Sequence, residues 1–95
     1  MTGKEISEIC ADAIVKNGWR AQAVVALEEL SEAQKEICKM LRGQGDDDHL
    51  AEEIADATIV LQQMALAFGI AGSVLEWIDK KAQRLADRLK GAQNE

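Results

Sequence analysis

Residues 49–69 read HLAEEIADATIVLQQMALAFG, and this stretch decides the expected fold of the 95-residue chain. Its apolar residues recur at spacings of three and four, which predicts an amphipathic helix that ends at Gly69. The predicted buried seam consists of Leu50, Ile54, Ala57, Leu61, Met64 and Phe68, broadened by Val60, Ala65 and Ala67. Glu53 and Asp56 border this seam, so carboxylates are expected at the margin of a buried face.

The segment before it, about 20–42, has the same organisation. Its predicted seam consists of Ala23, Leu27, Leu30, Ile37 and Leu41, with Ala26 and Ala33 beside it. Glu29, Glu32 and Glu36 form an acidic stripe along the edge of that seam. Gly43 supplies a stop, and the aspartates of GQGDDD are placed to cap the next helix. The two segments are therefore predicted to form a long central helical hairpin.

Two outer helices complete the expected domain. Thr2 with Glu5 predicts a capping box at the start of a first helix, which Asn17 and Gly18 end. Ser73 with Glu76 predicts a second capping box for the last helix. The chain contains no proline. We expect a single all-α domain over residues 1–95, with four helices at about 3–16, 20–42, 49–68 and 73–90.

Composition limits the classes of function. A net charge of −6 disfavours a nucleic-acid polymer as partner, because the phosphates would be repelled. No secretory signal is expected from MTGKEISEIC, and ATIVLQQMALAFGIAG is too short and interrupted to span a bilayer. Cys10 and Cys38 lack the closely spaced partners of a zinc site, which fits a reducing compartment. We expect a soluble, cytoplasmic protein whose thin core favours a dimer.

The acidic residues of the two central segments are in register with each other. Residues three apart share a helix face, so Glu29 lies with Glu32, and Glu53 lies with Asp56. In an antiparallel hairpin, residues at one level have position numbers with a constant sum, and both 29 with 56 and 32 with 53 sum to 85. Four carboxylates at one level repel unless a divalent cation neutralises them, and Mg²⁺ or Mn²⁺ suits such oxygen ligands. A solvated acidic face is the alternative reading.

The residues also resemble a known family. EELSE followed by EIAD is similar to the EExxE…ExxD signature of the MazG-like, all-α nucleoside triphosphate pyrophosphohydrolases. HLAEEIADATIVLQQMALAFG resembles that family's third helix, and ICKMLRG resembles the end of its second. DKKAQRL resembles the family's Asn-x-Lys-x-x-Arg pattern, with Asp79 in the Asn position. The resemblance covers roughly residues 19–90.

The resemblance implies a MazG-like four-helix architecture, assembled as a dimer or dimer of dimers, that hydrolyses a nucleoside triphosphate to the monophosphate and pyrophosphate with Mg²⁺. Its ligand set falls on Glu29, Glu32, Glu53 and Asp56. Lys81 and Arg84 are expected to bind the phosphates. Glu28 belongs to the signature but points off the metal-facing line, and Asp79 introduces a negative group where the family has an amide.

Several roles stay open. Glu32 and Glu29 are the predicted catalytic residues, with Glu32 accepting the proton of the attacking water. Trp19 is a candidate to stack on a nucleobase, although a tryptophan that opens a helix is more often a packing anchor. Two alternatives to the general hydrolase are retained. One is a dUTPase-like or phosphoribosyl-ATP pyrophosphohydrolase relative, and the other is a non-enzymatic helical dimerisation module.

Overall fold

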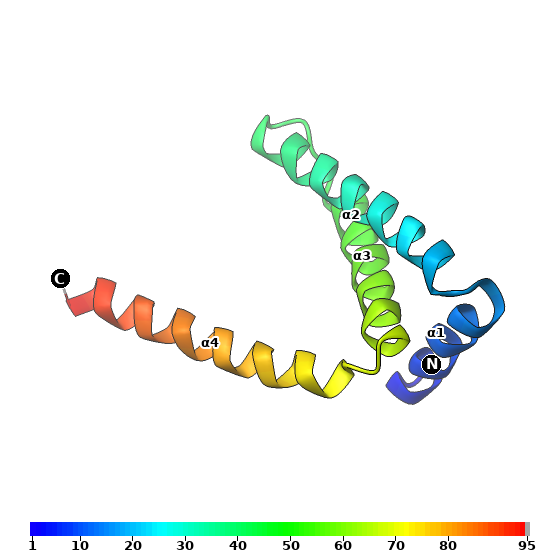
Figure 1. The fold of residues 1–95 in the computed structure, drawn as a ribbon. Coiled ribbons are helices and arrows are strands. Elements are labelled where there is room, and N and C mark those ends of the chain that lie inside the picture. Colours follow the sequence, from blue (N-terminus) through cyan, green and yellow to red (C-terminus); the bar gives the residue numbers. More distant parts are fainter. Residues whose placement is uncertain (95) are drawn as a thin grey trace.

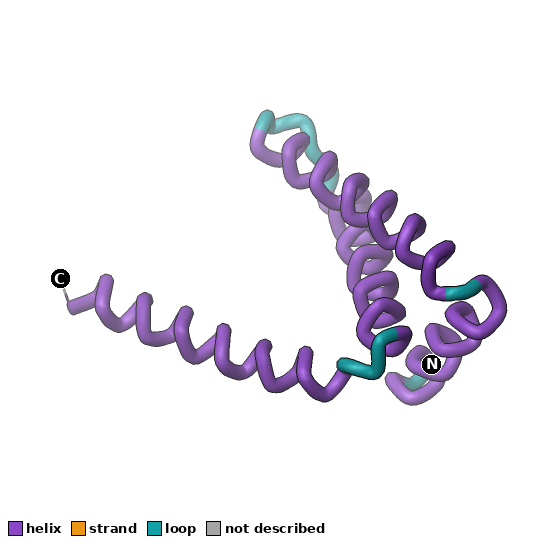
Figure 2. The backbone as a smooth tube through the Cα atoms, viewed as in Figure 1, coloured by secondary structure: helices purple, strands orange, loops and turns teal. Residues whose placement is uncertain are grey.

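Helices account for the whole fold of the part of the chain that the structure describes, with no strand among residues 1–94 (Figures 1 and 2). The computed structural model describes the backbone of these residues and the side chains of residues 1–91. The helices are α1 (Gly3–Asn17), α2 (Trp19–Leu41), α3 (Asp47–Ala67) and α4 (Ala71–Asn94). The prediction of four helices is confirmed.

The N-terminal helix begins and ends as its sequence predicts. The Thr2 hydroxyl accepts a hydrogen bond from the Glu5 N–H, and the Glu5 carboxylate accepts one from the Thr2 N–H, both at 3.1 Å. This reciprocal pair is the predicted capping box. Gly18 alone separates α1 from α2, with φ 82° and ψ 152°, a conformation that only glycine adopts without strain. The sharp reversal brings α1 back against α2 and α3.

The helices α2 and α3, which pack on each other more extensively than any other pair, form an antiparallel hairpin (Figure 1). Gln22 Nε2 donates a buried hydrogen bond to Gln63 Oε1 at 2.8 Å. The numbers 22 and 63 sum to 85, so the predicted register between α2 and α3 is confirmed. The turn closes with Asp46 as N-cap of α3, its carboxylate accepting from the N–H groups of Asp48 and His49.

The interior of the hairpin differs from the predicted apolar seams. The α2 face toward α3 consists of Gln22, Ala26, Glu29, Ala33 and Glu36. Leu27 is instead 68% exposed, Leu41 83% exposed and Ile37 50% exposed. On α3, Val60 and Ala65 are buried as predicted, whereas Ile54, Leu61 and Phe68 are each about half exposed. Small and amide side chains let the two helices approach closely, and this leaves the larger apolar side chains facing outward.

The last helix leaves the hairpin at once. Hydrogen bonds from the Gly69 N–H to the Leu66 carbonyl and from the Ile70 N–H to the Ala65 carbonyl end α3, and α4 begins at Ala71. The predicted capping box at Ser73 is therefore wrong, because Ser73 already lies inside the first turn of α4. No Cα atom in the described part of α4 lies within 8 Å of one in α1 or α2. Figure 1 shows α4 diverging from the hairpin in an open V.

The described helices include none that is both long enough and apolar enough to cross a bilayer. The Cα radius of gyration is 16.4 Å, whereas a compact domain of this length has about 12 Å. Only Cys10, Ala26, Val60 and Ala65 are buried among the described hydrophobic side chains. The single chain is thus an open arrangement whose tightest packing is in the α2–α3 hairpin and where α1 crosses α3.

Candidate functional site

Three carboxylates meet where α2 and α3 pack. Glu29 comes from α2, and Glu53 and Asp56 come from adjacent turns of one face of α3. One oxygen from each of the three lies within 4.8 Å of the others. All three side chains are partly buried. The antiparallel register brings them together, because 29 and 56 stand at the same level of the hairpin. We call Glu29, Glu53 and Asp56 the carboxylate cluster.

The cluster is electrostatically unfavourable without a cation. Burial raises the pKa of Glu29 above its ordinary value, and repulsion from Asp56 and Glu53 raises it further. Burial likewise raises the pKa of Glu53, followed by repulsion from Asp56 and Glu32. Among the described residues, no lysine or arginine is within ion-pair distance of these carboxylates. Each shift therefore reports like charges held together in partly dehydrated surroundings.

One oxygen of the cluster has no partner. Glu53 Oε2 is shielded from solvent and accepts no hydrogen bond from any described group. Buried polar atoms in folded proteins nearly always have a partner, and a buried anionic oxygen without one destabilises the fold. An unpartnered oxygen inside a group of three convergent carboxylates is the donor arrangement that a hard divalent cation satisfies.

The predicted fourth ligand lies just outside the cluster. Glu32 is solvent-exposed and is not one of the three residues whose oxygens converge. Its charge nevertheless contributes to the raised pKa values of Glu29 and Glu53, so it lies near both. Glu28 is also exposed, in keeping with the prediction that it points off the metal-facing line.

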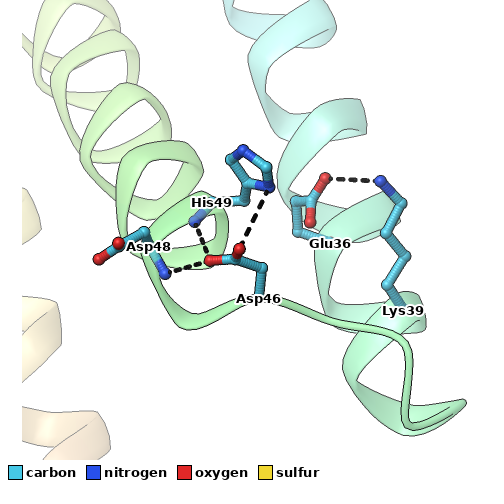
Figure 3. A network of polar contacts seen from close by, with 5 residues as sticks. All are labelled: Glu36, Lys39, Asp46, Asp48 and His49. Carbon is cyan, nitrogen blue, oxygen red and sulfur yellow. Dashed lines mark hydrogen bonds and ion pairs between the residues drawn. The ribbon is translucent and has the colours of Figure 1, made fainter.

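A second polar network lies at the loop end of the hairpin, where α3 begins (Figure 3). Glu36 is only 8% exposed and pairs with Lys39 at 3.1 Å on the same helix. Asp46 caps α3, and hydrogen bonds from the N–H groups of His49 and Asp48 lower its pKa. His49 Nδ1 lies 4.0 Å from an Asp46 oxygen, and its side chain is exposed. His49 is therefore a first-turn surface residue rather than part of the cluster.

The predicted substrate-binding residues are not gathered at the cluster. Trp19 packs edge-on against Phe68 with ring centroids 5.1 Å apart, and the Arg20 guanidinium lies 4.7 Å from its ring. This is the packing-anchor role. Lys81 and Arg84 belong to α4, and Lys81 Nζ lies 5.7 Å from the Trp77 ring centroid. Because α4 diverges from the hairpin, its backbone carries both residues away from the carboxylate cluster of the same chain (Figure 1).

The chemistry of the donor set fits Mg²⁺ or Mn²⁺. All convergent donors are carboxylate oxygens, which are the ligands that hard divalent cations prefer. A bound cation would relieve both the mutual repulsion and the unpartnered Glu53 oxygen. Three protein ligands also leave coordination positions for waters or phosphate oxygens, as is usual for Mg²⁺.

Sequence reasoning missed one buried acid. Glu36 is predicted at the edge of the α2 seam with Glu29 and Glu32, yet it is buried on the α3-facing side of α2. Its spacing of seven residues from Glu29 carries the signal, because seven residues return to the same helix face.

Searches against family models, curated proteins and solved structures found no match to this chain. The functional assignment therefore depends on the chemistry of the carboxylate cluster and the motifs around it.

Proposed function

We propose that the chain is a Mg²⁺-dependent nucleoside triphosphate pyrophosphohydrolase of the MazG-like type, acting on nucleotide pools. The convergence of Glu29, Glu53 and Asp56 oxygens within 4.8 Å, one glutamate oxygen being buried without a partner, carries the proposal. The spacing of the signature residues supports it. The expected products are a nucleoside monophosphate and pyrophosphate, formed when water attacks the α-phosphate and pyrophosphate leaves.

The acidic residues of the hairpin have two proposed roles, metal binding and proton acceptance. Glu29, Glu53 and Asp56 hold the cation, with Glu32 available from the next turn as a further ligand or as a base. A bound divalent cation would supply charge neutralisation for the triphosphate and a lowered pKa for a coordinated water. Glu32 suits proton acceptance because it is exposed and close to the cluster without belonging to it.

The phosphate-binding role of Lys81 and Arg84 is part of the same proposal. Lys81 offers a point charge and Arg84 a planar fork for phosphate oxygens. Within one chain, α4 carries both away from the carboxylate cluster. Their proposed role thus requires an assembly, a dimer or a dimer of dimers, in which α4 of one copy approaches the carboxylates of another.

The proposal is tested with a panel of canonical and modified nucleoside triphosphates in the presence of Mg²⁺. Release of pyrophosphate with the monophosphate supports it, whereas release of orthophosphate contradicts it. Asp56→Asn is expected to reduce kcat/KM by more than about 100-fold, since even groups that only support metal ligands contribute 10- to 100-fold. Glu52→Gln is the matched control, because Glu52 is an exposed neighbour outside the cluster. Full activity in Asp56→Asn overturns the assignment of the site.

The breadth of the substrate response separates the enzyme classes. Turnover of dUTP or phosphoribosyl-ATP alone would identify the narrower relatives. The absence of turnover with every nucleotide, and of any Mg²⁺-dependent rise in melting temperature, would favour the non-enzymatic dimerisation module. That second function has its own structural support, since large apolar side chains of α2 and α4 are exposed.

A further inference from the structure

One ion pair of α2 lies at the loop end of the hairpin, beside the carboxylate cluster. The Lys39 Nζ donates a hydrogen bond to Glu36 Oε1 at 3.1 Å, and the Glu36 side chain is buried against α3. Among residues 1–91, whose side chains the structure describes, Lys39 is the only lysine or arginine that is not fully exposed. The pair therefore fixes one positive charge on the hairpin itself.

The side chains of the pair and of the cluster lean toward each other. Side chains of a helix tilt toward its N-terminus. In α2 this direction leads away from the loop, and Figure 3 shows the Lys39 side chain reaching from the loop end back to Glu36. In the antiparallel α3 the same tilt carries Glu53 toward the loop. The two sets of charged groups thus approach each other along the hairpin axis.

The separation between the pair and the cluster is about one helix turn. In the confirmed register, position 53 stands at the level of position 32, so Glu36 lies four residues, or about 6 Å, farther along the axis. Burial raises the pKa of Glu53, and the charges of neighbouring acids, Glu36 among them, raise it further, which agrees with this short separation. The Lys39 ammonium group is close to the cluster without forming an ion pair with it.

A triphosphate at the cluster requires positive charge beyond that of a metal ion. Three carboxylates and one divalent cation have a net charge of −1, which repels phosphate oxygens. Lys81 and Arg84 belong to α4, whose backbone diverges from the cluster of the same chain. Lys39 is on the hairpin. Its ammonium group has three N–H donors and uses one on Glu36, so two remain for phosphate oxygens.

We propose that Lys39 binds the terminal phosphate of the nucleotide and makes the site prefer triphosphates to diphosphates. This inference rests on the proposed hydrolase function, in which a cation on the carboxylate cluster holds the α-phosphate. One helix turn, about 5.4 Å, is comparable with the separation of the α- and γ-phosphates, so a chain one phosphate shorter ends before the lysine. Glu36 is a positioning residue, because its buried carboxylate orders the ammonium group before the phosphate binds.

The first experiment measures binding without turnover. Inorganic tripolyphosphate is titrated by calorimetry, in excess Mg²⁺ and at physiological ionic strength, into the wild type, Lys39→Met and Lys39→Arg. Lys39→Met is expected to bind it at least about tenfold more weakly, because a hydrogen bond to a charged group has been lost, whereas Lys39→Arg keeps the charge and most of the affinity.

Lys35→Met is the matched control, because Lys35 is an exposed lysine of the same helix whose charge is screened by salt. It is expected to bind tripolyphosphate as the wild type does. Equal affinity in Lys39→Met and the wild type, or a wild type that does not bind tripolyphosphate, overturns the inference.

The affinity for Mg²⁺ alone separates a phosphate contact from a structural role. Lys39→Met removes a positive charge beside the cluster, so Mg²⁺ should bind the variant as tightly as the wild type, or more tightly. If Lys39 served only to neutralise Glu36 and keep the hairpin packed, its loss would weaken the binding of Mg²⁺ and of tripolyphosphate alike. Parallel losses of both affinities would therefore contradict phosphate binding by Lys39.

Turnover tests the preference for triphosphates. Lys39→Met is expected to lower the ratio of kcat/KM for a nucleoside triphosphate to that for its diphosphate by about tenfold, and Lys35→Met should leave the ratio unchanged. An unchanged ratio in an active Lys39→Met overturns the inference and leaves the hydrolase function standing. If the wild type itself releases no pyrophosphate, the proposed function fails, and the calorimetric comparison still decides whether Lys39 binds phosphate.

Discussion

At the scale of single residues, Glu53 shows how a binding site lowers the stability of the fold that carries it. Its raised pKa and its unpartnered buried oxygen both destabilise the metal-free chain. A cation bound by this oxygen would be held strongly, because its shielding from water strengthens every electrostatic contact that it makes. A group of this kind is favourable only with its ligand bound, so stability and binding oppose each other at this position.

Replacing Glu53 is therefore expected to stabilise the metal-free protein. Glu53→Gln removes one charge from the cluster and provides an amide that the neighbouring carboxylates can accept from. In the presence of a chelator, its melting temperature should exceed that of the wild type by a few degrees. With Mg²⁺ added, the wild type should gain stability and the variant should not. Calorimetry measures both, and a lower melting temperature of the chelated variant would contradict the account.

The pH dependence of stability follows from the same shifts. Glu29 and Glu53 have folded-state pKa values raised above the ordinary 4.5, so the folded chain binds more protons than the unfolded chain above that pH. Their contribution to stability is greatest below the unfolded value and is lost as pH rises through the folded values. Asp46 has a lowered pKa, and its stabilising cap is lost only as pH falls below the ordinary 3.8. Metal-free protein should therefore melt higher at mildly acidic pH than at neutral pH.

Thermal melts of the chelated protein across that range measure the effect. The double variant Glu29→Gln/Glu53→Gln is the control, and its melting temperature should vary less between mildly acidic and neutral pH. If the melting temperature of the wild type instead rises steadily towards neutral pH, and that of the double variant rises in the same way, the carboxylate cluster does not govern the pH dependence of stability.

At the scale of elements, polar pairing sets how α2 and α3 meet. Gln22 and Gln63 are each 8% exposed and bond to each other, and the Asn17 amide donates to Gln22 Oε1 at 3.2 Å. A buried amide pair loses its partner if either helix shifts along its axis. It therefore specifies the register in which Glu29 and Asp56 share a level.

Removing one member of this pair should be more harmful than removing both. Gln63→Leu leaves the Gln22 amide buried without its partner and is expected to lower the free energy of unfolding by about 1–3 kcal/mol. The double variant Gln22→Leu/Gln63→Leu should recover most of that loss, because no buried polar group is left unsatisfied. Denaturant unfolding measures both variants. Equal or additive destabilisation in the double variant would show that the amides do not act as a pair.

The elements were predictable, and their facing surfaces were not. Local signals at Thr2, Asp46 and Gly69 mark helix ends because capping depends on neighbouring residues. The register followed from arithmetic on the acids. The prediction of which helix faces are buried was wrong for Leu27 and Ile54. Periodicity shows that each shares a stripe with other apolar residues, but it does not show whether another helix covers that stripe. A second, narrower stripe that contains small and amide residues forms the contact, and the larger apolar side chains stay exposed.

At the scale of the whole molecule, the open V explains why a chain with 47% hydrophobic residues buries so few of them. The Gly69 turn directs α4 away from α3. Leu75 and Ile78, near the start of α4, still line a groove with α3 residues such as Leu61, whereas Leu85 and Leu89 farther along are more than half exposed. Apart from the first two residues, Figure 2 shows loops only at the helix junctions, so the exposed apolar side chains of α2 and α4 belong to regular helices. The exposed apolar residues of α2 and α4 thus recur at helical spacing and are not scattered singly.

The stability of the protein should accordingly depend on its concentration. If folding of α4 is completed by dimerisation, mass action makes the melting temperature rise with protein concentration. We expect a fall of several degrees on about a hundredfold dilution of the wild type, since the apolar surface buried between copies is lost on dissociation. Leu85→Glu places a charge among the exposed apolar residues of α4, so it should melt at one temperature throughout if the proposed dimer forms through them. Scanning calorimetry over that dilution series measures both, and a wild-type melting temperature that does not move would mean that α4 contributes nothing to a shared core.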